Sequence, residues 1–372
     1  MNILLINYEY PPLGGGAATA TQELGRAMHT LGHVVTILTA GFSTVRGEAA
    51  ENGVTIRRLA CRRSRADRSS FAEKAFFVAH AAIALPGLIR RSRPDACIVF
   101  FSLPCGPLGR LVRGLSGVPY VVSLRGGDVP GTEPGLAALH WWLAPVRRWV
   151  LRGAKAVVAN SEGLKVLSVR VDPFAVTVIP NGVDTAAFTP SRDGRRPAYR
   201  FLFAGRLNEQ KNVALLLSAA ARLRESTAAA FTVSIVGDGP LAAALHAQAD
   251  ELGLGEAVEW MPWVAREKMA ACYASADCLV NPSLYEGMPN VVLEAMASGM
   301  PVIASDVAGN ADVVEHEHTG LLFPGQDASA LAEAMRRMLE TRGGDWGAAG
   351  RARALDRHSW AAAAAAYVAL FH

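Results

Sequence analysis

The sequence lacks the marks of several protein classes. It has five cysteines in 372 residues, none in a CxxC pair. Their odd number and scattered positions predict reduced, mostly buried thiols of a cytoplasmic protein instead of a disulfide framework. No uncharged apolar run approaches the roughly 18 residues that a membrane span needs. The first residues form a short strand pattern without a basic leader, so we expect no signal peptide.

Motifs for two common kinds of cofactor chemistry are also missing. The sequence contains no Asp-x-Asp, and the run Gly14–Gly16 lacks the GxGxxG spacing of a nicotinamide site. A dehydrogenase is therefore disfavoured. The segment Glu315-His316-Glu317-His318 resembles a metal cluster, but its spacing of two residues precedes a predicted strand, so we expect no metal there.

Charge is scarce overall and unevenly divided. Residues 1–185 hold 21 Lys and Arg against 12 Asp and Glu, whereas residues 186–372 hold 16 against 21. The basic residues concentrate in two groups: Arg57, Arg58, Arg62, Arg63, Arg65 and Arg68, then Arg90, Arg91 and Arg93. Two interpretations stay open: contact with an anionic partner such as anionic lipid, a lipid-linked diphosphate or an acidic glycan, or a solvated arginine-rich surface. No aromatic stripe accompanies the charge, which disfavours nucleic acid.

What the sequence does contain is a regular alternation of strand and helix patterns. With 51% apolar residues and 372 positions, the chain fits two folded domains. The alternation predicts parallel sheets covered by helices, interrupted by a polar segment at 189–197 that is typical of a linker. We predict two Rossmann-like α/β domains facing a cleft, over residues 1–185 and 186–355. The apolar helix in residues 356–372 is expected to pack back towards the first domain.

The most informative segment runs from Glu286 to Glu294. A turn with Gly287 and Pro289 leads into a helix predicted over 290–297, so one carboxylate precedes the helix and the other lies in it. Between them the helix N-terminus offers backbone N–H groups that favour an anion such as a diphosphate. Carboxylates accept strong hydrogen bonds from sugar or ribose hydroxyls. A sugar nucleotide suits this arrangement, although glutamate pairs on a solvated helix face are also common.

A second pattern opens the second domain. A strand predicted to end near Gly205 is followed by Arg206 and Lys211. Two cations at the carboxyl end of a parallel strand can neutralise a diphosphate leaving group. Ordinary surface basicity is the alternative, which the strand-end position disfavours.

Together these segments resemble the retaining GT-B glycosyltransferases of family 4. The resemblance rests on Gly205-Arg206…Lys211, Val236-Gly-Asp-Gly-Pro240, Pro282-Ser-Leu-Tyr-Glu-Gly287, Glu286-x(7)-Glu294 and Ile179-Pro-Asn-Gly-Val-Asp184, in order along nearly the whole chain. It implies that the diphosphate lies between cations and a helix N-terminus, without a catalytic metal or cofactor.

The resemblance also implies roles for single residues. Glu286 would contact the donor sugar, Glu294 the ribose, and Arg206 and Lys211 the diphosphate. Gly15 and Gly16 would let the first loop approach the donor phosphate and acceptor. Trp263 would stack on the nucleobase, with a buried core position as an equal alternative. The remaining donor-side candidates are Gly237, Gly287, Met288, Pro289, Asn290 and Val291.

The first domain departs from the family pattern at its acceptor-side candidates, Arg125, Gly126, Gly127 and Asp128. Many relatives carry a His-Gly-x-Asp-like segment here, and Arg125 stands where the His is expected. Asp128 is our candidate for a catalytic residue that orients the acceptor or the sugar, beside Arg206, Lys211 and Glu286. An Arg–Asp pair that merely shapes a turn is the alternative.

One further segment, His140 to Trp149, allows two interpretations. Its aromatic and arginine residues form either a membrane-facing amphipathic helix or, as we favour here, a buried helix between domains.

The resulting expectation is a cytoplasmic enzyme, peripheral at the inner face of the membrane if the basic half contacts lipid. It would move a sugar, with retention, from a UDP- or GDP-sugar to a hydroxyl of a sugar, glycolipid or lipid-linked acceptor. Polysaccharide or glycoconjugate biosynthesis is the expected setting. A nucleotide-sugar epimerase and a non-catalytic sugar-nucleotide-binding protein are the alternatives.

Overall fold

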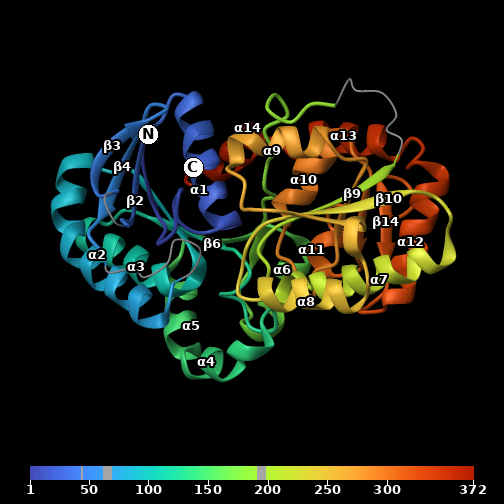
Figure 1. Ribbon diagram of the computed structural model, residues 1–372. Coiled ribbons are helices and arrows are strands. Elements are labelled where there is room, and N and C mark those ends of the chain that lie inside the picture. Colours follow the sequence, from blue (N-terminus) through green and yellow to red (C-terminus); the bar gives the residue numbers. More distant parts are fainter. Residues whose placement is uncertain (43–44, 62–68, 191–197) are drawn as a thin grey trace. The chain divides into compact units, whose positions relative to one another are not determined.

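The computed structural model describes residues 1–42, 45–61, 69–190 and 198–372. Of the expected basic groups, Arg62, Arg63, Arg65 and Arg68 lie outside these residues, as does most of the expected linker. The chain forms two compact units, one of Met1–Gly182 with Trp360–His372 and the other of Val183–Ser359 (Figure 1). These boundaries lie a few residues from positions 185 and 355, where the sequence pattern placed them.

Unit 1, Met1–Gly182 with Trp360–His372, is built on an eight-stranded sheet with the order β3-β4-β2-β1-β5-β6-β7-β8. Its pairs are parallel except β3 with β4, which is antiparallel. Every residue of β5 and β6 is buried, as expected for central strands covered on both faces. The strands are β1 (Asn2–Ile6), β2 (Val34–Ala40), β3 (Gly47–Glu51), β4 (Val54–Leu59), β5 (Ala96–Phe100), β6 (Tyr120–Leu124), β7 (Ala156–Ala159) and β8 (Val176–Val178).

Helices cover this sheet, and the last one comes from the end of the chain. The C-terminal helix α14 packs against α1 and buries Trp360 and Tyr367 in the unit 1 core. The helices are α1 (Gly16–Thr30), α2 (Phe71–Ser92), α3 (Gly106–Ser116), α4 (Ala137–Trp142), α5 (Ala144–Gly153), α6 (Glu162–Val171) and α14 (Trp360–Ala369). Two short helical segments, the π-helix η1 (Phe101–Cys105) and the 3-10 helix η2 (Pro134–Leu136), complete the unit.

Helix α2 is long and apolar enough to cross a membrane by length and composition alone. Charged residues stand near both ends of this helix, so the uncharged part of its sequence is shorter than the helix itself. A capping box between Ser70 and Glu73 begins the helix, and Arg90 and Arg91 lie in its last turn. Its buried side chains, including Phe77 and Leu85, face the unit 1 core, where α2 packs on α3. The remaining side chains of α2 are half-buried or exposed.

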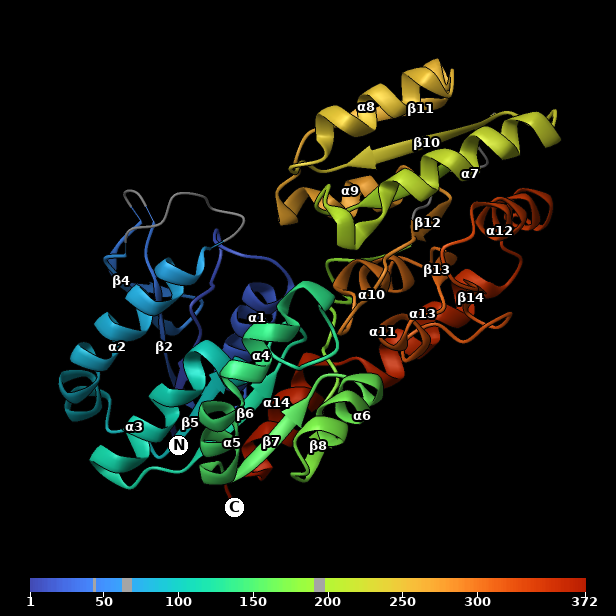
Figure 2. The same ribbon diagram turned by 90° about the horizontal axis from the view of Figure 1, so that it is seen from below.

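Unit 2, Val183–Ser359, contains a fully parallel six-stranded sheet with the order β11-β10-β9-β12-β13-β14. Helices α7 and α12 pack together on it, and α10 packs against α13 (Figure 2). The strands are β9 (Tyr199–Ala204), β10 (Phe231–Val236), β11 (Val258–Met261), β12 (Cys278–Asn281), β13 (Val302–Ser305) and β14 (Gly320–Phe323). The helices are α7 (Val213–Ser226), α8 (Ala242–Glu251), α9 (Arg266–Ala274), α10 (Asn290–Ala297), α11 (Ala308–Ala311), α12 (Ala328–Thr341) and α13 (Trp346–Arg357), with the short turns η3 (Glu209–Lys211) and η4 (Gly255–Ala257).

The predicted α/β class with two parallel-sheet units is confirmed. All five cysteines are buried free thiols, also as predicted. The sequence pattern missed β3 because its residues, Gly-Glu-Ala-Ala-Glu, are neither β-branched nor aromatic. This strand is an edge strand held by its antiparallel neighbour β4, which is a tertiary effect.

Candidate active site

A buried network of amides and hydroxyls holds the loop between β12 and α10. The Asn281 side chain donates to Oδ1 of Asn310 over 2.9 Å, and Ser283 Oγ donates to Oδ1 of Asn281 over 3.1 Å. Ser305 Oγ donates to the Ser283 carbonyl over 2.5 Å. Since each group is buried and paired, the network fixes the start of the loop that carries Glu286. Sequence reasoning missed Asn281, Ser305 and Asn310. They come from the ends of β12 and β13 and from α11, which meet only in the tertiary structure.

Lys211 and Glu286, which lie 75 positions apart in the sequence, form an ion pair. The Lys211 Nζ donates to Oε1 of Glu286 over 2.5 Å, and the side chains are only 17% and 7% exposed. The neighbouring backbone ties the same two segments together. Gln210 Nε2 donates to the Tyr285 carbonyl over 3.0 Å, and the Leu284 N–H donates to the Gln210 carbonyl over 2.8 Å. The structure therefore joins the predicted cation and the predicted first carboxylate.

Two glycines let the loops after neighbouring strands approach closely. Gly205 follows β9 and Gly237 follows β10, and a Cβ on Gly237 would lie 1.9 Å from the Gly205 carbonyl oxygen. A side chain at Gly237 is therefore excluded. Arg206 follows Gly205 directly, so it stands at the carboxyl edge of the sheet with Lys211.

Glu294 lies on α10 and is buried. Its Oε2 accepts a 2.8 Å hydrogen bond from the Tyr273 hydroxyl, and Arg266 Nε lies 3.9 Å from its Oε1. Burial and the neighbouring Glu294 raise the pKa of Tyr273 well above its usual value, which keeps that hydroxyl a donor. Sequence reasoning found Glu294 but not Tyr273 or Arg266, which reach it from α9.

The N-terminus of α10 lies between the two carboxylates. Pro289 occupies the N-cap position, so its side chain offers no oxygen to the first-turn N–H groups of Asn290 and Val291. Met288 is buried. The backbone of Gly309 packs against the Glu286 and Gly287 carbonyls so closely that a Cβ there would lie 2.6 Å from both oxygens. The predicted residues 286–291 therefore form one tightly supported segment, a turn over 286–289 that leads into the first turn of α10.

The aromatic residues near the end of β11 differ in environment. Trp263 is 64% exposed, so the interpretation of this residue as a core tryptophan is wrong. Trp260, within the strand, stacks on His246 with 3.9 Å between ring centroids. An exposed indole in the loop after a strand is available for stacking on a planar ligand.

The glycine loop of unit 1 follows β1, as predicted. Gly14 has a φ of +88°, and a Cβ on it would overlap the Glu9 side chain. Gly15 has open space where a Cβ would be, and Gly16 begins α1. The loop thus presents backbone at a helix N-terminus and at the carboxyl edge of the sheet.

Asp128 is buried and accepts hydrogen bonds with both carboxylate oxygens. Oδ1 accepts from the Arg125 N–H over 2.9 Å, and Oδ2 accepts from the Ser102 N–H over 2.6 Å. Burial raises the pKa of Asp128, while these hydrogen bonds oppose the rise. Asp128 therefore joins the loops after β5 and β6. Gly126, with φ +122°, and Gly127 complete the turn between Arg125 and Asp128.

The Arg125 side chain contacts Asn181 and, on the C-terminal helix α14, Tyr367. Its guanidinium donates to Asn181 Oδ1 over 2.7 Å and to the Tyr367 hydroxyl over 3.4 Å, and it lies 4.7 Å from the Phe100 ring centroid. Arg125 and Asp128 are paired within the turn through the Arg125 backbone N–H, which donates to the Asp128 carboxylate. The Arg125 side chain connects the turn to residue 181, next to the unit boundary, and to α14.

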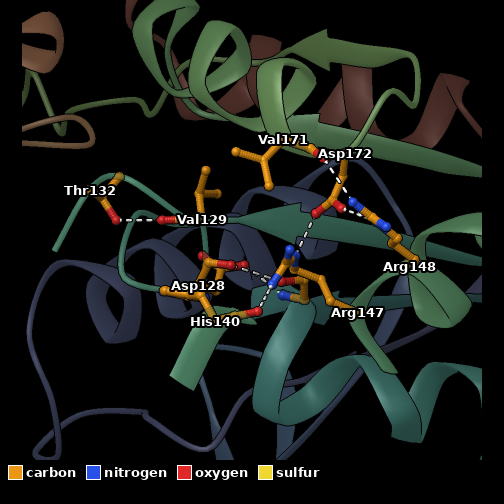
Figure 3. A network of polar contacts seen from close by, with 9 residues as sticks. Asp128, Val129, Thr132, His140, Arg147, Arg148, Val171 and Asp172 are labelled. Carbon is orange, nitrogen blue, oxygen red and sulfur yellow. Dashed lines mark hydrogen bonds and ion pairs between the residues drawn. The ribbon is translucent and has the colours of Figure 1, made fainter. Parts of the chain in front are cut away.

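Figure 3 shows a second buried polar network beside this turn, which sequence reasoning missed. Arg147 donates to Asp172 over 2.5 Å and to the His140 carbonyl over 3.0 Å, and Arg148 donates to Asp172 over 2.8 Å. Burial and the Arg147 charge lower the pKa of His140, while a hydrogen bond with the backbone of Gly127 opposes them. Its contact with the Gly127 backbone places this histidine next to the candidate acceptor turn.

The residues of the apparent metal cluster have structural partners. A ring nitrogen of His316 accepts from the Leu322 N–H over 3.0 Å, Glu317 pairs with Arg337, and Glu315 pairs with Arg353. These contacts tie the turn before β14 to α12 and α13.

Comparisons with known proteins identify the family of this chain. The family model "Glycosyl transferases group 1" matches residues 198–341, and the model "Glycosyl transferase 4-like domain" matches residues 15–182. The chain therefore belongs to the group 1 glycosyltransferases.

Individual relatives are moderately similar. An MMP alpha-(1->4)-mannosyltransferase of Mycolicibacterium hassiacum is 32% identical, over 72% of this chain and 68% of its own length. A UDP-Gal:alpha-D-GlcNAc-diphosphoundecaprenol alpha-1,3-galactosyltransferase of Escherichia coli is 28% identical, over 70% of each chain.

Among solved structures, sucrose-phosphate synthase from Thermosynechococcus elongatus superposes with a TM-score of 0.86 at 24% identity, over 99% of this chain and 98% of that one. The Anabaena HepE protein in complex with UDP and glucose superposes with a TM-score of 0.79 at 19% identity, over 99% of this chain and 98% of that one. At these identities the likeness shows the fold, which is GT-B.

Proposed function

We propose that this glycosyltransferase moves a sugar from a UDP- or GDP-sugar to an acceptor hydroxyl, with retention at the anomeric carbon. The observation that carries the proposal is the 2.5 Å pair of Lys211 and Glu286 at the carboxyl edge of the unit 2 sheet. A cation and a carboxylate at this edge match the two parts of a sugar diphosphate, its anionic phosphates and its neutral hydroxyls.

In this proposal, unit 2 holds the donor. Lys211 and Arg206 bind the diphosphate, with the N-terminus of α10 as a third positive element. Glu286 accepts hydrogen bonds from sugar hydroxyls, and Glu294 accepts them from the ribose. Trp263 stacks on the base. The cationic side chains take the part that a metal plays in other enzymes, so we propose a metal-independent reaction.

The acceptor belongs to unit 1 in this proposal. The Gly15–Gly16 backbone and the turn from Arg125 to Asp128 are the candidate surfaces. The name of the Escherichia coli relative specifies a UDP-galactose donor and a lipid diphosphate acceptor. This supports a sugar, glycolipid or lipid-linked acceptor here, used in polysaccharide or glycoconjugate biosynthesis at the cytoplasmic face of the membrane.

The proposed step is a front-face displacement. The acceptor oxygen forms a bond to the anomeric carbon while the bond from that carbon to the diphosphate oxygen breaks. The electron pair of the broken bond stays on the diphosphate, and the acceptor proton moves to a phosphate oxygen. Lys211 and Arg206 stabilise the charge that develops on the leaving diphosphate, which is the main electrostatic demand of the reaction.

A two-stage experiment tests this function. UDP-, GDP- and ADP-sugars are first ranked by the rise in melting temperature that each causes, because a ligand of the folded state stabilises it by mass action. The best donor is then incubated with lipid-linked and soluble sugar acceptors, while free nucleoside diphosphate and the anomeric configuration of the product are measured.

Acceptor-dependent release of nucleoside diphosphate with a retained linkage supports the proposal. Interconversion of donor sugars without acceptor would identify an epimerase. Donor stabilisation without turnover on any acceptor would identify a binding protein, and a product of inverted configuration would refute the proposed displacement.

A further inference from the structure

Three tryptophans of unit 1 lie exposed on α4 and α5. Trp141 and Trp142 are 72% and 73% exposed, and Trp149 is 47% exposed. The expectation that this aromatic segment is buried is therefore wrong for these side chains. Leaving large indole rings in water is unfavourable, and tryptophan is the residue that concentrates at membrane–water interfaces.

A buried network of hydrogen bonds fixes the helices that carry these exposed tryptophans. Arg147, on the inner side of α5, donates to Asp172 and to the His140 carbonyl (Figure 3). The contact with His140 links the end of α4 to α5, and the contact with Asp172 links α5 to the end of α6. These contacts fix α4 and α5 against α6, while Trp141 and Trp142 remain on the exposed side of α4.

The surroundings of the tryptophans are positively charged. Residues 96–127 and 134–161, which include α3, α4 and α5, contain no Asp or Glu. Arg113 donates to the Gly153 carbonyl and Lys155 to the Phe371 carbonyl, and both of these acceptors are uncharged. The Arg110 guanidinium lies 4.6 Å from the Trp149 ring centroid. The buried Asp172 offsets only one of the two charges of Arg147 and Arg148.

Helix α3 packs against α5, and α4 leads directly into α5, so these groups share one region (Figures 1 and 2). We name it the α3–α5 face and define it by six residues: Arg110, Arg113, Trp141, Trp142, Trp149 and Arg152.

We propose that the α3–α5 face binds the surface of an anionic lipid bilayer. The tryptophan rings enter the interfacial layer while the arginines pair with lipid phosphates, each cation adding to the attraction. Exposed apolar neighbours, among them Pro145 and Val146, favour a bilayer over nucleic acid. They gain by leaving water for lipid, whereas nucleic acid offers them no apolar layer. This inference is independent of the proposed transfer, because vesicle binding requires neither donor nor acceptor.

The test uses the full chain and vesicles of phosphatidylcholine with or without phosphatidylglycerol. Co-sedimentation gives the bound fraction, and brominated lipids report tryptophan insertion by quenching. The Trp141→Ser/Trp142→Ser variant changes only exposed side chains. Val166→Ser/Val169→Ser is the matched control, because it removes two exposed apolar side chains from α6 of the same unit. An Arg110→Gln/Arg152→Gln variant tests the charge.

We expect the original chain to bind the anionic vesicles and not the neutral ones, and added salt should weaken this binding. The vesicle affinity should fall by about tenfold in the tryptophan variant and in the arginine variant, and it should be unchanged in the α6 control. Melting temperatures confirm that each variant is folded. Absence of binding, equal binding to neutral vesicles, or equal loss in the α6 control would overturn the proposal. Binding to heparin or nucleic acid without binding to vesicles would also overturn it, since it assigns the face to a soluble polyanion.

Discussion

The Nζ of Lys211 lies 2.5 Å from Oε1 of Glu286, and both side chains are largely shielded from water. In the proposed reaction this lysine turns to the donor diphosphate, while the carboxylate turns to the sugar hydroxyls. In that proposal the ion pair holds the two side chains in place until a ligand replaces their mutual contact.

Replacing Lys211 with Ala should lower turnover by at least about tenfold to a hundredfold, because a charge-stabilising donor to the leaving group is lost. The measurement is the steady-state release of nucleoside diphosphate with the best donor and acceptor. Arg222→Ala, which removes an exposed cation of α7 in the same unit, is the control and should leave turnover unchanged. Near-normal turnover of a folded Lys211→Ala protein would mean that the diphosphate role is misassigned.

The hydroxyl of Tyr273 positions the carboxylate of Glu294, so Tyr273→Phe should weaken donor binding. A hydrogen bond to a charged group contributes enough that we expect the KM for the donor to rise about tenfold, with a smaller effect on kcat. Tyr199→Phe is the matched control, since the Tyr199 hydroxyl donates to an uncharged group, the Asp277 carbonyl, over 3.4 Å. If both variants have the donor KM of the original chain, Tyr273 does not position Glu294 for the ribose.

Arg125 connects three segments of unit 1, so its removal should destabilise that unit. Arg125→Ala leaves the buried Asn181 oxygen without the guanidinium and deletes the contact with Tyr367, and we expect a loss of about 2 kcal/mol. Urea unfolding followed by circular dichroism measures this loss. Arg170→Ala, an exposed arginine on α6, should change stability little. An equal midpoint for both variants would show that the Arg125 contacts carry no net stability.

His140 should make unit 1 less stable in mild acid. Its pKa is lowered from 6.5 in the folded state by burial and by Arg147, so below pH 6.5 the unfolded chain binds more protons than the folded one. The free energy of unfolding is therefore unaffected by His140 above pH 6.5, and it decreases as the pH falls from 6.5 towards the lowered pKa of the folded state. Melting temperatures between pH 8 and pH 5, compared with His140→Gln, measure the effect. If the melting temperature of His140→Gln falls just as steeply with decreasing pH, the titrating group is a residue other than His140.

Much of the fold could be predicted because the strands are short, apolar and bounded by glycine or proline turns. The strand over 120–124 and the helix over 290–297 lie where the pattern placed them. The edge strand β3 and the helix α13 were missed, because their sequences do not show a strong apolar period. Local propensity is weak there, and packing against neighbours decides the structure.

The candidate site also has a part that could be predicted from the sequence and a part that could not. The types of its groups could be predicted, since a diphosphate needs cations and sugar hydroxyls need carboxylates. Their partners could not. Tyr273 approaches Glu294 from another helix, and Arg125 reaches Tyr367 across 242 sequence positions. No local pattern records such a contact.

The sequence alone determined the α/β class, the two units and the residue types at the strand ends, because hydrophobic periodicity and turn residues act over a few neighbouring positions. Only the tertiary structure decided which of these groups meet and which side chains remain exposed. It joined Lys211 to Glu286, directed Arg125 towards Asn181, and left Trp141 and Trp142 in water. Those outcomes depend on packing between elements that are distant in the chain.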